Sequence, residues 1–297
     1  MAETTKRTTR PMTRDLILAA TTFPRHSDES VEHYLARITH VHLQHKKIGT
    51  IRALDQCKKI QVLYLYDNYI EVIENLSGVT DLKYLFLQNN YIKVIPTLTS
   101  AALEKLRLDE NEISIVEGLE ELRCLEELSI ANQRIPSELR FDSLSMGAIS
   151  QSLRVLDVSG NQLTSISQLL QLENLEKLVC ADNNISELSE LENIRFFVRL
   201  VDLTFRGNPV CRLNYRYRDI VCGLAAESLR LLDDVPITSQ KLESIRAMQI
   251  HRKKVEVFRE RQREEEEGRS QRGDSLGVGL DSKRTVEDVE NFNHDFN

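Results

Sequence analysis

A repeated pattern of spaced apolar residues constrains this chain more than any other feature. The pattern L-x-x-L-x-L-x-x-N-x-I, in which other apolar residues replace some of the leucines, recurs in six full copies. These copies occupy residues 60–70, 82–92, 103–113, 125–135, 153–163 and 175–185. Degenerate copies at 38–48 and 200–210 make eight units, with a step of about 22 residues. Such a fixed step indicates a solenoid, because one unit cannot bury its apolar face alone and must stack on its neighbours.

The order of residues within a unit predicts its local structure. In the first full unit, Leu63 and Leu65 share one side of a short strand and Tyr64 and Tyr66 share the other, because side chains alternate along a strand. The Asn at the ninth position can hydrogen-bond backbone groups of the turn that follows, so that successive units form an asparagine ladder. Apolar residues three and six positions after each unit predict a short helical segment on the opposite, convex side.

These eight copies resemble the leucine-rich repeat. The resemblance implies an α/β fold: a curved solenoid of about eight 22-residue repeats, with a parallel sheet on its concave face. Residues 207–234 begin with Gly-Asn-Pro and end with "LRLLDD". They resemble the cap that closes intracellular leucine-rich repeat proteins, and a cap is needed because the last strand would otherwise be an open edge.

The composition along the chain predicts five segments. Residues 239–267 carry a loose stripe of apolar side chains at helical spacing, which predicts a helix. Residues 268–297 are polar and contain Gly and Ser, which favours disorder. Ser30 is the predicted N-cap of a capping unit. The predicted segments are an N-terminal segment or cap (1–30), the leucine-rich repeats (31–210), the C-terminal cap (207–238), a charged helix (239–267) and a disordered tail (268–297).

Two residues depart from the asparagine ladder. Lys46 takes the Asn position in the first unit, where a terminal repeat can tolerate it. Gln133 takes it in the middle, just before the longest insertion, and we expect the ladder to be disturbed there. The insertion is interpreted either as a longer loop without further consequence or as a loop around 140–142 that protrudes from a bent solenoid and contacts a partner.

Charge and cysteine content limit the compartment and the partners. The net charge of −7 disfavours nucleic acid as a partner, since phosphate binding needs a basic surface. No apolar run reaches the ~18 residues that a membrane span needs, and no signal peptide follows Met1. Five cysteines without a C-x-x-C spacing indicate a reducing compartment and no disulfide framework. We therefore expect a cytoplasmic protein that binds neither nucleic acid nor membrane.

The concave face carries the candidate site. In each unit the third, fifth and seventh residues should leave the sheet toward solvent, and Tyr64 should neighbour both His42 and Phe86 because adjacent strands lie about 4.8 Å apart. Aromatic side chains exposed together indicate a binding surface, since they supply buried area at low entropic cost. The residues that we expect to bind protein are His42, Tyr64, Tyr66, Tyr84, Phe86, Gln88, Arg107 and Asp109.

Within this site the roles differ. The tyrosines and Phe86 are the predicted apolar anchors, and Arg107 and Asp109 are predicted to give polar specificity. Val62 should face the same side, while Tyr69 and Tyr91 extend the patch along the rim. The alternative is that the rings only cover one another or are shielded by the N-terminal segment.

No pattern in the chain indicates catalysis. Walker, G-x-S-x-G and H-E-x-x-H motifs are missing from the sequence. His40, His42 and His45 are spaced as candidate metal ligands, but no Cys, Asp or Glu joins them within the strand. We expect no enzyme, no cofactor, no metal site and no small-molecule substrate.

The resemblance extends to one branch of the repeat proteins. That intracellular branch includes the nuclear leucine-rich regulatory subunit of protein phosphatase 1, the axonemal dynein light chain and the U2 snRNP A-prime protein. The stretches "VLYLYDN", "ANQRIP" and "GNPVCRLNYRYRD" are most similar to regulatory subunits of protein phosphatase 1. This similarity implies binding to the phosphatase catalytic subunit and association with tubulin, the cytoskeleton, microtubule-organising centres, centrosomes and, as a further location, the cilium.

Two other functions stay open at this point. One is a ciliary or axonemal scaffold that binds tubulin or dynein and has no phosphatase role. The other is an RNA-processing adaptor, which the charge disfavours. The hydrophobic part of a phosphatase-docking motif occurs at residues 194–196, but the basic residue before it is missing. We therefore expect any phosphatase contact to use the concave face.

Overall fold

The computed structural model of the chain describes residues 8–213 and 216–273. Two compact units meet at the boundary between Ile245 and Arg246, and each is described by itself. Most of the predicted tail lies outside the described residues. The first unit contains all the repeats.

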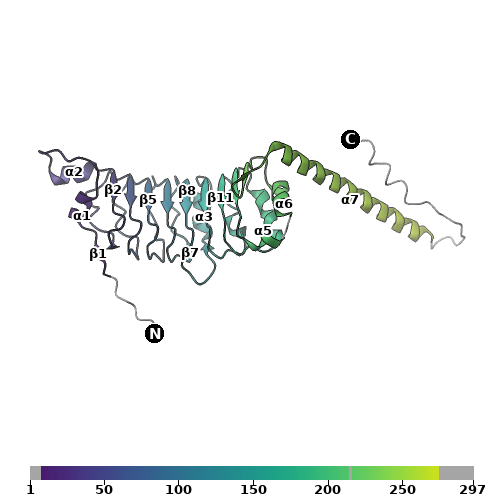
Figure 1. Cartoon of the computed structure of the whole chain (residues 1–297), viewed down its shortest axis with the longest axis horizontal. Helices are drawn as coiled ribbons and strands as arrows, with labels where there is room; N and C mark the ends of the chain where they lie inside the picture. Colours follow the sequence, from purple (N-terminus) through teal and green to yellow (C-terminus); the bar gives the residue numbers. More distant parts are fainter. Residues whose placement is uncertain (1–7, 214–215, 274–297) are drawn as a thin grey trace, which may run out of the picture. The chain divides into compact units, whose positions relative to one another are not determined.

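A parallel sheet runs through the first unit. Its strands follow one another in chain order, one from each of the eight repeats and two more from the segment after them, and among these only the last pair is antiparallel (Figure 1). In order these strands are β2 (His40–His42), β4 (Val62–Tyr64), β5 (Tyr84–Phe86), β6 (Lys105–Arg107), β8 (Glu127–Ser129), β10 (Val155–Asp157), β11 (Lys177–Val179), β12 (Asp202–Thr204), β13 (Leu231–Leu232) and β14 (Val235–Pro236). The predicted leucine-rich repeat solenoid is confirmed.

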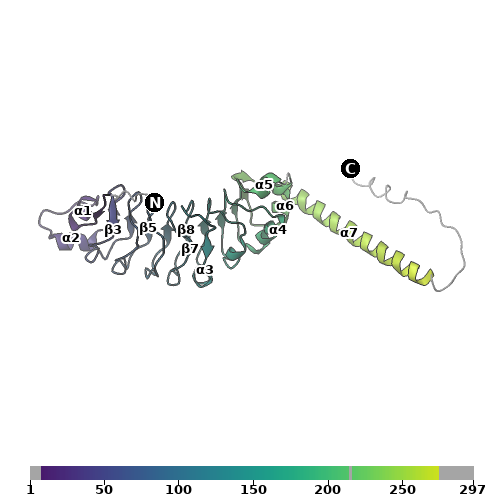
Figure 2. The same cartoon turned by 90° about the horizontal axis from the view of Figure 1, so that it is seen from below.

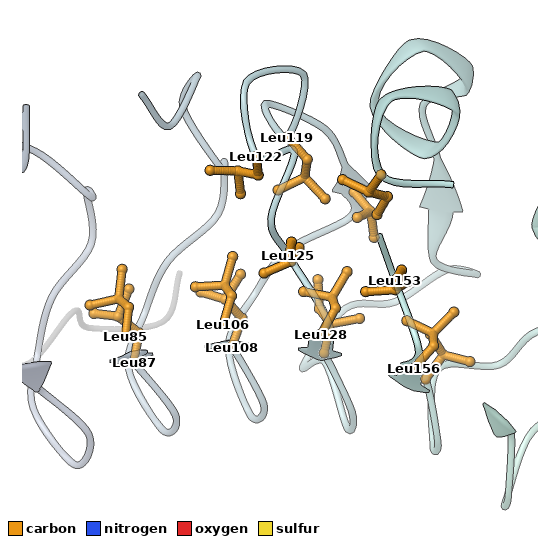
Figure 3. Packing of buried hydrophobic residues seen from close by; sticks show 14 of the residues in the cluster. Leu85, Leu87, Leu106, Leu108, Leu119, Leu122, Leu125, Leu128, Leu153 and Leu156 are labelled. Carbon is orange, nitrogen blue, oxygen red and sulfur yellow. The ribbon is translucent and has the colours of Figure 1, made fainter. Parts of the chain in front are cut away.

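The core consists of columns of identical repeat positions. Leu85 pairs in register with Leu106, and Leu106 with Leu128, so that each central leucine packs on the next. These side chains are at most 1% exposed. They form a row on the inner side of the sheet, across from Leu119 and Leu122 of the opposite side of the repeat (Figure 3). Each repeat therefore buries its apolar face only because another repeat covers it.

The asparagine ladder closes the turn after each strand. The amide nitrogen of Asn90 donates to the carbonyl oxygens of Leu65 and Leu87, both at 3.0 Å, and its Oδ1 accepts from the backbone nitrogen of Ile70 at 3.0 Å. One side chain thus bonds its own turn and the preceding repeat. The other buried asparagines of the ladder are Asn68, Asn111, Asn161, Asn183 and Asn208.

Gln133 does not disturb the ladder, so that expectation is wrong. Its Nε2 donates to the carbonyl oxygen of Leu108 at 2.9 Å, and its Oε1 accepts from the backbone nitrogen of Ile113 at 3.0 Å. The side chain is 5% exposed. Glutamine carries the same amide group as asparagine on a side chain one methylene longer, and this amide keeps both bonds to the preceding repeat.

Residues 140–149 of the insertion pack onto the convex side as a strand and a helix. Strand β9 (Arg140–Phe141) pairs in parallel with β7 (Ile115–Val116) of the preceding repeat. Asp142 then caps helix α3 (Ser143–Ile149) by accepting from the Ser145 backbone nitrogen at 2.9 Å. Met146 and Ile149 are fully buried. Residues 140–142 therefore form a paired strand and a helix N-cap, not the protruding loop that the second interpretation placed there.

Helices are fewer on the convex side than the pattern predicts. Residues 51–83 cross it in turns and extended backbone, with Ile73, Leu76 and Val79 buried. Among the described residues, the helices on this side other than α3 belong to the later repeats: η1 (Ser167–Leu169), α4 (Leu188–Leu191) and η2 (Glu192–Phe196).

The N-terminal end is covered by a short strand and two helices. Strand β1 (Arg10–Pro11) pairs with β3 (Ile48–Thr50), and helix α1 (Arg14–Ala19) inserts Ile17, which is fully buried. Helix α2 (Val31–Arg37) follows. Ser30 caps it, as predicted, by accepting from the His33 backbone nitrogen at 3.1 Å.

The other end of the first unit carries helices α5 (Pro209–Leu213) and α6 (Tyr217–Leu224), which lie at the opposite end from α1 and α2 (Figure 2). Arg218 ties α6 to the last strands by donating to the Leu232 carbonyl oxygen at 2.8 Å. Helix α7 (Ser239–Gly273) begins at the predicted residue but runs six residues beyond the predicted end at 267. Gly268 breaks a helix only weakly, at about 1 kcal/mol relative to Ala. No helix among the described residues is long and apolar enough to cross a membrane.

Replacing Asn90 by Ala should destabilise the protein by about 3 kcal/mol or more. The change leaves several buried backbone groups of two repeats without a partner, and each costs about 1–3 kcal/mol. Asn174→Ala is the matched control, because Asn174 is only partly buried and its amide bonds Gln151 alone. Urea unfolding followed by circular dichroism measures both. Equal midpoints for the two variants would show that the ladder does not hold the repeats together.

Candidate protein-binding surface

The register of the sheet brings the fifth residues of successive units into one row. His42 pairs with Tyr64, Tyr64 with Phe86 and Phe86 with Arg107. The leucines on either side of each of these residues are buried, so the row stands on the concave face. The row continues through Ser129 to Asp157.

Three rings of this row stack face to face. The ring centroids of His42 and Tyr64 lie 4.6 Å apart with planes 12° from parallel, and those of Tyr64 and Phe86 lie 4.9 Å apart at 10°. The spacing between strands fixes this stacking distance. Tyr66 meets Tyr64 edge-on at 6.4 Å. The predicted neighbours are confirmed, and all four rings remain partly exposed.

Val62 was predicted to face solvent from this side of the sheet. It is only 5% exposed, so that prediction is wrong. Its register partners His40 and Tyr84 flank it on both sides and cover the smaller side chain. Tyr84 is partly exposed, and its hydroxyl donates to Glu104 at 3.1 Å. Gln88 lies in the next row along the strands, partly exposed, with its Oε1 buried and without a hydrogen-bond donor.

The aromatic row is followed by an ion-pair group. Lys105 Nζ lies 2.5 Å from Glu127, and Arg107 forms a second ion pair with the same carboxylate. Burial alone would raise the pKa of Glu127, but the hydrogen bonds from the two cations outweigh burial and lower it. Both cations of β6 are therefore neutralised within the sheet face.

At Asp109, in contrast to Glu127, the effect of burial on the pKa outweighs that of the hydrogen bonds. Burial raises the pKa of its carboxyl group, and the nearby Asp157 adds to this effect. Hydrogen bonds from Ser129 and the Ala131 backbone nitrogen, and to a smaller degree the charge of Arg107, offset it only in part. The second oxygen of each of these two aspartates has no partner among the described residues. The sequence pattern placed Asp157 on this face but did not show that it and Asp109 act on one another.

A second, separate row runs along the turns after the strands. Tyr69 and Tyr91 lie 6.0 Å apart between ring centroids, and the Arg134 guanidinium lies 5.1 Å from the Tyr91 centroid. His45 and Asp67 line a shallow hollow beside the two tyrosines. Arg134 was missed at the sequence level, although it holds the same position after the ladder residue as both tyrosines.

The three histidines of the first strand region are used in other contacts. His42 stacks on Tyr64, His45 meets Tyr66 edge-on at 5.6 Å, and His40 Nδ1 shares a 2.9 Å hydrogen bond with the Thr39 hydroxyl. Across residues 8–213 and 216–273 no group of three or more His, Cys, Asp or Glu side chains is arranged to hold a metal ion.

Comparison with known proteins supports the repeat assignment. A family model described as "Leucine Rich repeats (2 copies)" matches residues 151–193. An internalin from Listeria monocytogenes has a similar structure, with a TM-score of 0.53 at 20% identity over 71% of this chain and 65% of that one. A leucine-rich repeat protein from Leptospira interrogans also has a TM-score of 0.53, at 24% identity over 70% of this chain and 52% of that one.

Several curated proteins are similar over part of the repeats. Leucine-rich repeat-containing protein 56 of Rattus norvegicus is 34% identical over 102 residues, 31% of this chain and 18% of that protein. Centrosomal protein of 72 kDa of Mus musculus is 35% identical over 100 residues, 34% of this chain and 15% of that protein. U2 small nuclear ribonucleoprotein A' of Neurospora crassa is 40% identical over 72 residues, 23% of this chain and 29% of that protein. The chain thus spans less than a third of each of these relatives.

The fold and these similarities define the class: the chain has the fold of the leucine-rich repeat proteins. Within that class, its distinguishing features are the stacked rings of the first strands and the unpaired carboxylates that follow them.

Asp109→Asn should raise the unfolding midpoint at pH 7. The raised pKa means that the folded state disfavours the charged carboxylate. The penalty is therefore absent below the ordinary value of 3.8 and complete above the folded pKa. Asparagine keeps an oxygen for Ser129 and Ala131. Thermal unfolding from pH 3 to pH 8 measures the gain, which should disappear at the acid end. A variant that is less stable than the parent at pH 7 would contradict this account.

Proposed function

We propose that the chain is a non-catalytic scaffold that binds protein partners through its concave face. The observation that carries this proposal is the stack of His42, Tyr64 and Phe86 on an open sheet face. Large rings that are already ordered by stacking lose little entropy on binding and offer apolar area to a partner. The alternative that the rings serve only to cover one another leaves their exposed edges without a role.

The partner we propose first is the catalytic subunit of protein phosphatase 1, together with tubulin or another cytoskeletal protein. Its support is the similarity of the repeat and cap stretches to protein phosphatase 1 regulatory subunit 42, a testis leucine-rich repeat protein. A location at the centrosome or another microtubule-organising centre is supported by the similarity to a centrosomal protein of 72 kDa. The cytoplasm and the cilium belong to the same proposal.

Regulation in this proposal is by docking alone. The rings would anchor the partner, and Arg107, Asp109 and Gln88 would set which partner is accepted. Residues 194–196 do not serve as the docking segment: of their two apolar anchor residues, Ile194 is 1% exposed and only Phe196, at 48%, is open to another protein. Binding at the concave face would direct which substrates reach the phosphatase.

The second candidate function is a ciliary or axonemal scaffold that binds tubulin or dynein without a phosphatase role. It uses the same face, so a pull-down must separate the two. The full chain is used as bait in testis or ciliated-cell extract, and bound phosphatase catalytic subunit, tubulin and dynein are quantified. If the bait retains tubulin or dynein but not the phosphatase catalytic subunit, the proposal of phosphatase binding is rejected and the ciliary or axonemal scaffold is kept.

Replacing Tyr64 and Phe86 together by Ala should weaken binding of the retained partner at least tenfold, because two central aromatic anchors each contribute about 1–2 kcal/mol or more. The matched control is Val72→Ala with Val94→Ala. These residues are 58% and 57% exposed, lie in the same two repeats and face away from the sheet. Titration calorimetry measures affinity and thermal unfolding checks stability. If the aromatic pair unfolds the protein, the rings are structural; if it binds as the parent does, the concave face is not the site.

A further inference from the structure

The charges next to the aromatic row are unevenly balanced. Each cation nearest the middle of the concave face already has a carboxylate: Lys105 and Arg107 share Glu127, and Lys177 lies 2.7 Å from Asp202. Asp109 and Asp157 have no cation within ion-pairing distance among the described residues. The middle of the face is therefore left with two carboxylates that repel one another.

The two carboxylates stand on either side of one strand. Asp157 pairs in register with Ser129 of β8, and Asp109 accepts hydrogen bonds from the Ser129 hydroxyl and from the backbone nitrogen of Ala131, two residues after the strand ends. Ser129 and Ala131, which follow the register between them, have short side chains. Each carboxylate uses only its Oδ1 in these bonds, which leaves both Oδ2 atoms for a ligand.

The other unsatisfied polar atoms of this face are also acceptors. The Oε1 atoms of Gln44 and Gln88 and the Oδ1 atom of Asp202 are buried and accept no hydrogen bond. Gln88 lies beside Asp109 in the seventh-position row. Buried acceptors without donors cost free energy, and a ligand that supplies donors recovers it.

We propose that the occupant of the concave face is a protein segment that places an apolar side chain on the Tyr64–Phe86 stack and a lysine or arginine between Asp109 and Asp157. This inference rests on the proposed protein-binding function and adds the chemistry of the partner. A cation between the two aspartates relieves their repulsion and supplies the missing donors, and arginine can bond both carboxylates at once.

The strand spacing fixes the distance between the two partner residues. From β5, which carries Phe86, to β8, which lies between the aspartates, there are two strand steps, or about 10 Å. An extended segment covers this distance in about three residues, at about 3.3 Å per residue. A helix covers it in about seven residues, which also lie on one helix face. The partner motif is therefore an apolar residue and a basic residue, in either order, separated by about three positions in an extended segment or about seven in a helix.

The test uses the full chain as bait in selection from a displayed library of random 16-residue peptides. Enriched sequences should combine an apolar residue with Lys or Arg at a spacing of about three or seven. Synthetic copies of them are then titrated by fluorescence anisotropy, with Gln or Glu in place of the basic residue. Each replacement should weaken binding at least tenfold, and Glu more than Gln.

Variants of the chain complete the test. Asp109→Asn with Asp157→Asn should abolish the preference for Lys or Arg, whereas Asp55→Asn, which removes an exposed carboxylate outside the sheet, should not. Thermal unfolding confirms that each variant is folded. Peptides that need Tyr64 and Phe86 but show no preference for a basic residue would overturn this inference and keep the proposed function. A selection without enrichment, or peptides indifferent to the two rings, would overturn both.

Discussion

The stacking of one repeat on the next is the constraint on which the structure depends. No repeat has an apolar core of its own, so each buried leucine needs the leucine of the adjacent repeat as its neighbour. The asparagine ladder adds the polar half of the same constraint, because each amide bonds backbone groups of two repeats. Gln133 shows that the amide matters more than the length of its stem. The caps at both ends follow, since the first and last repeats would each leave one face uncovered.

The same constraint leaves the concave face free for function. The inward positions of every strand are committed to the core, and most of the alternate positions stay outside it. Strand spacing then brings residues of different repeats within contact distance, which produces both the ring stack and the ion pairs around Glu127. Asp109 and Asp157 lie in the same sheet face without a cation, so this part of the molecule gives up stability that a basic partner could restore.

The comparison with other proteins separates the inward positions of the strands from the outward ones. Internalins share the solenoid at 20% identity because the inward pattern is sufficient to define it. What a member of this class binds is decided by the outward residues, on which the fold places few demands. The aromatic row, the ion-pair group and the unpaired aspartates are therefore the features that a proposal about partners has to explain, and the repeat architecture alone explains none of them.

The sequence by itself determined the repeat, the phase of each strand, the ladder and the N-cap at Ser30, because all of these depend on spacing along the chain. It also placed His42, Tyr64 and Phe86 side by side, since one repeat step is one strand. It was wrong for Val62, which its neighbours cover, for the insertion, which packs as a strand and helix, and for the helical content of the convex side. Only the tertiary structure decided which charges are paired. Pairing depends on side-chain distances between repeats, and these place Glu127 against two cations while leaving Asp109 and Asp157 with none.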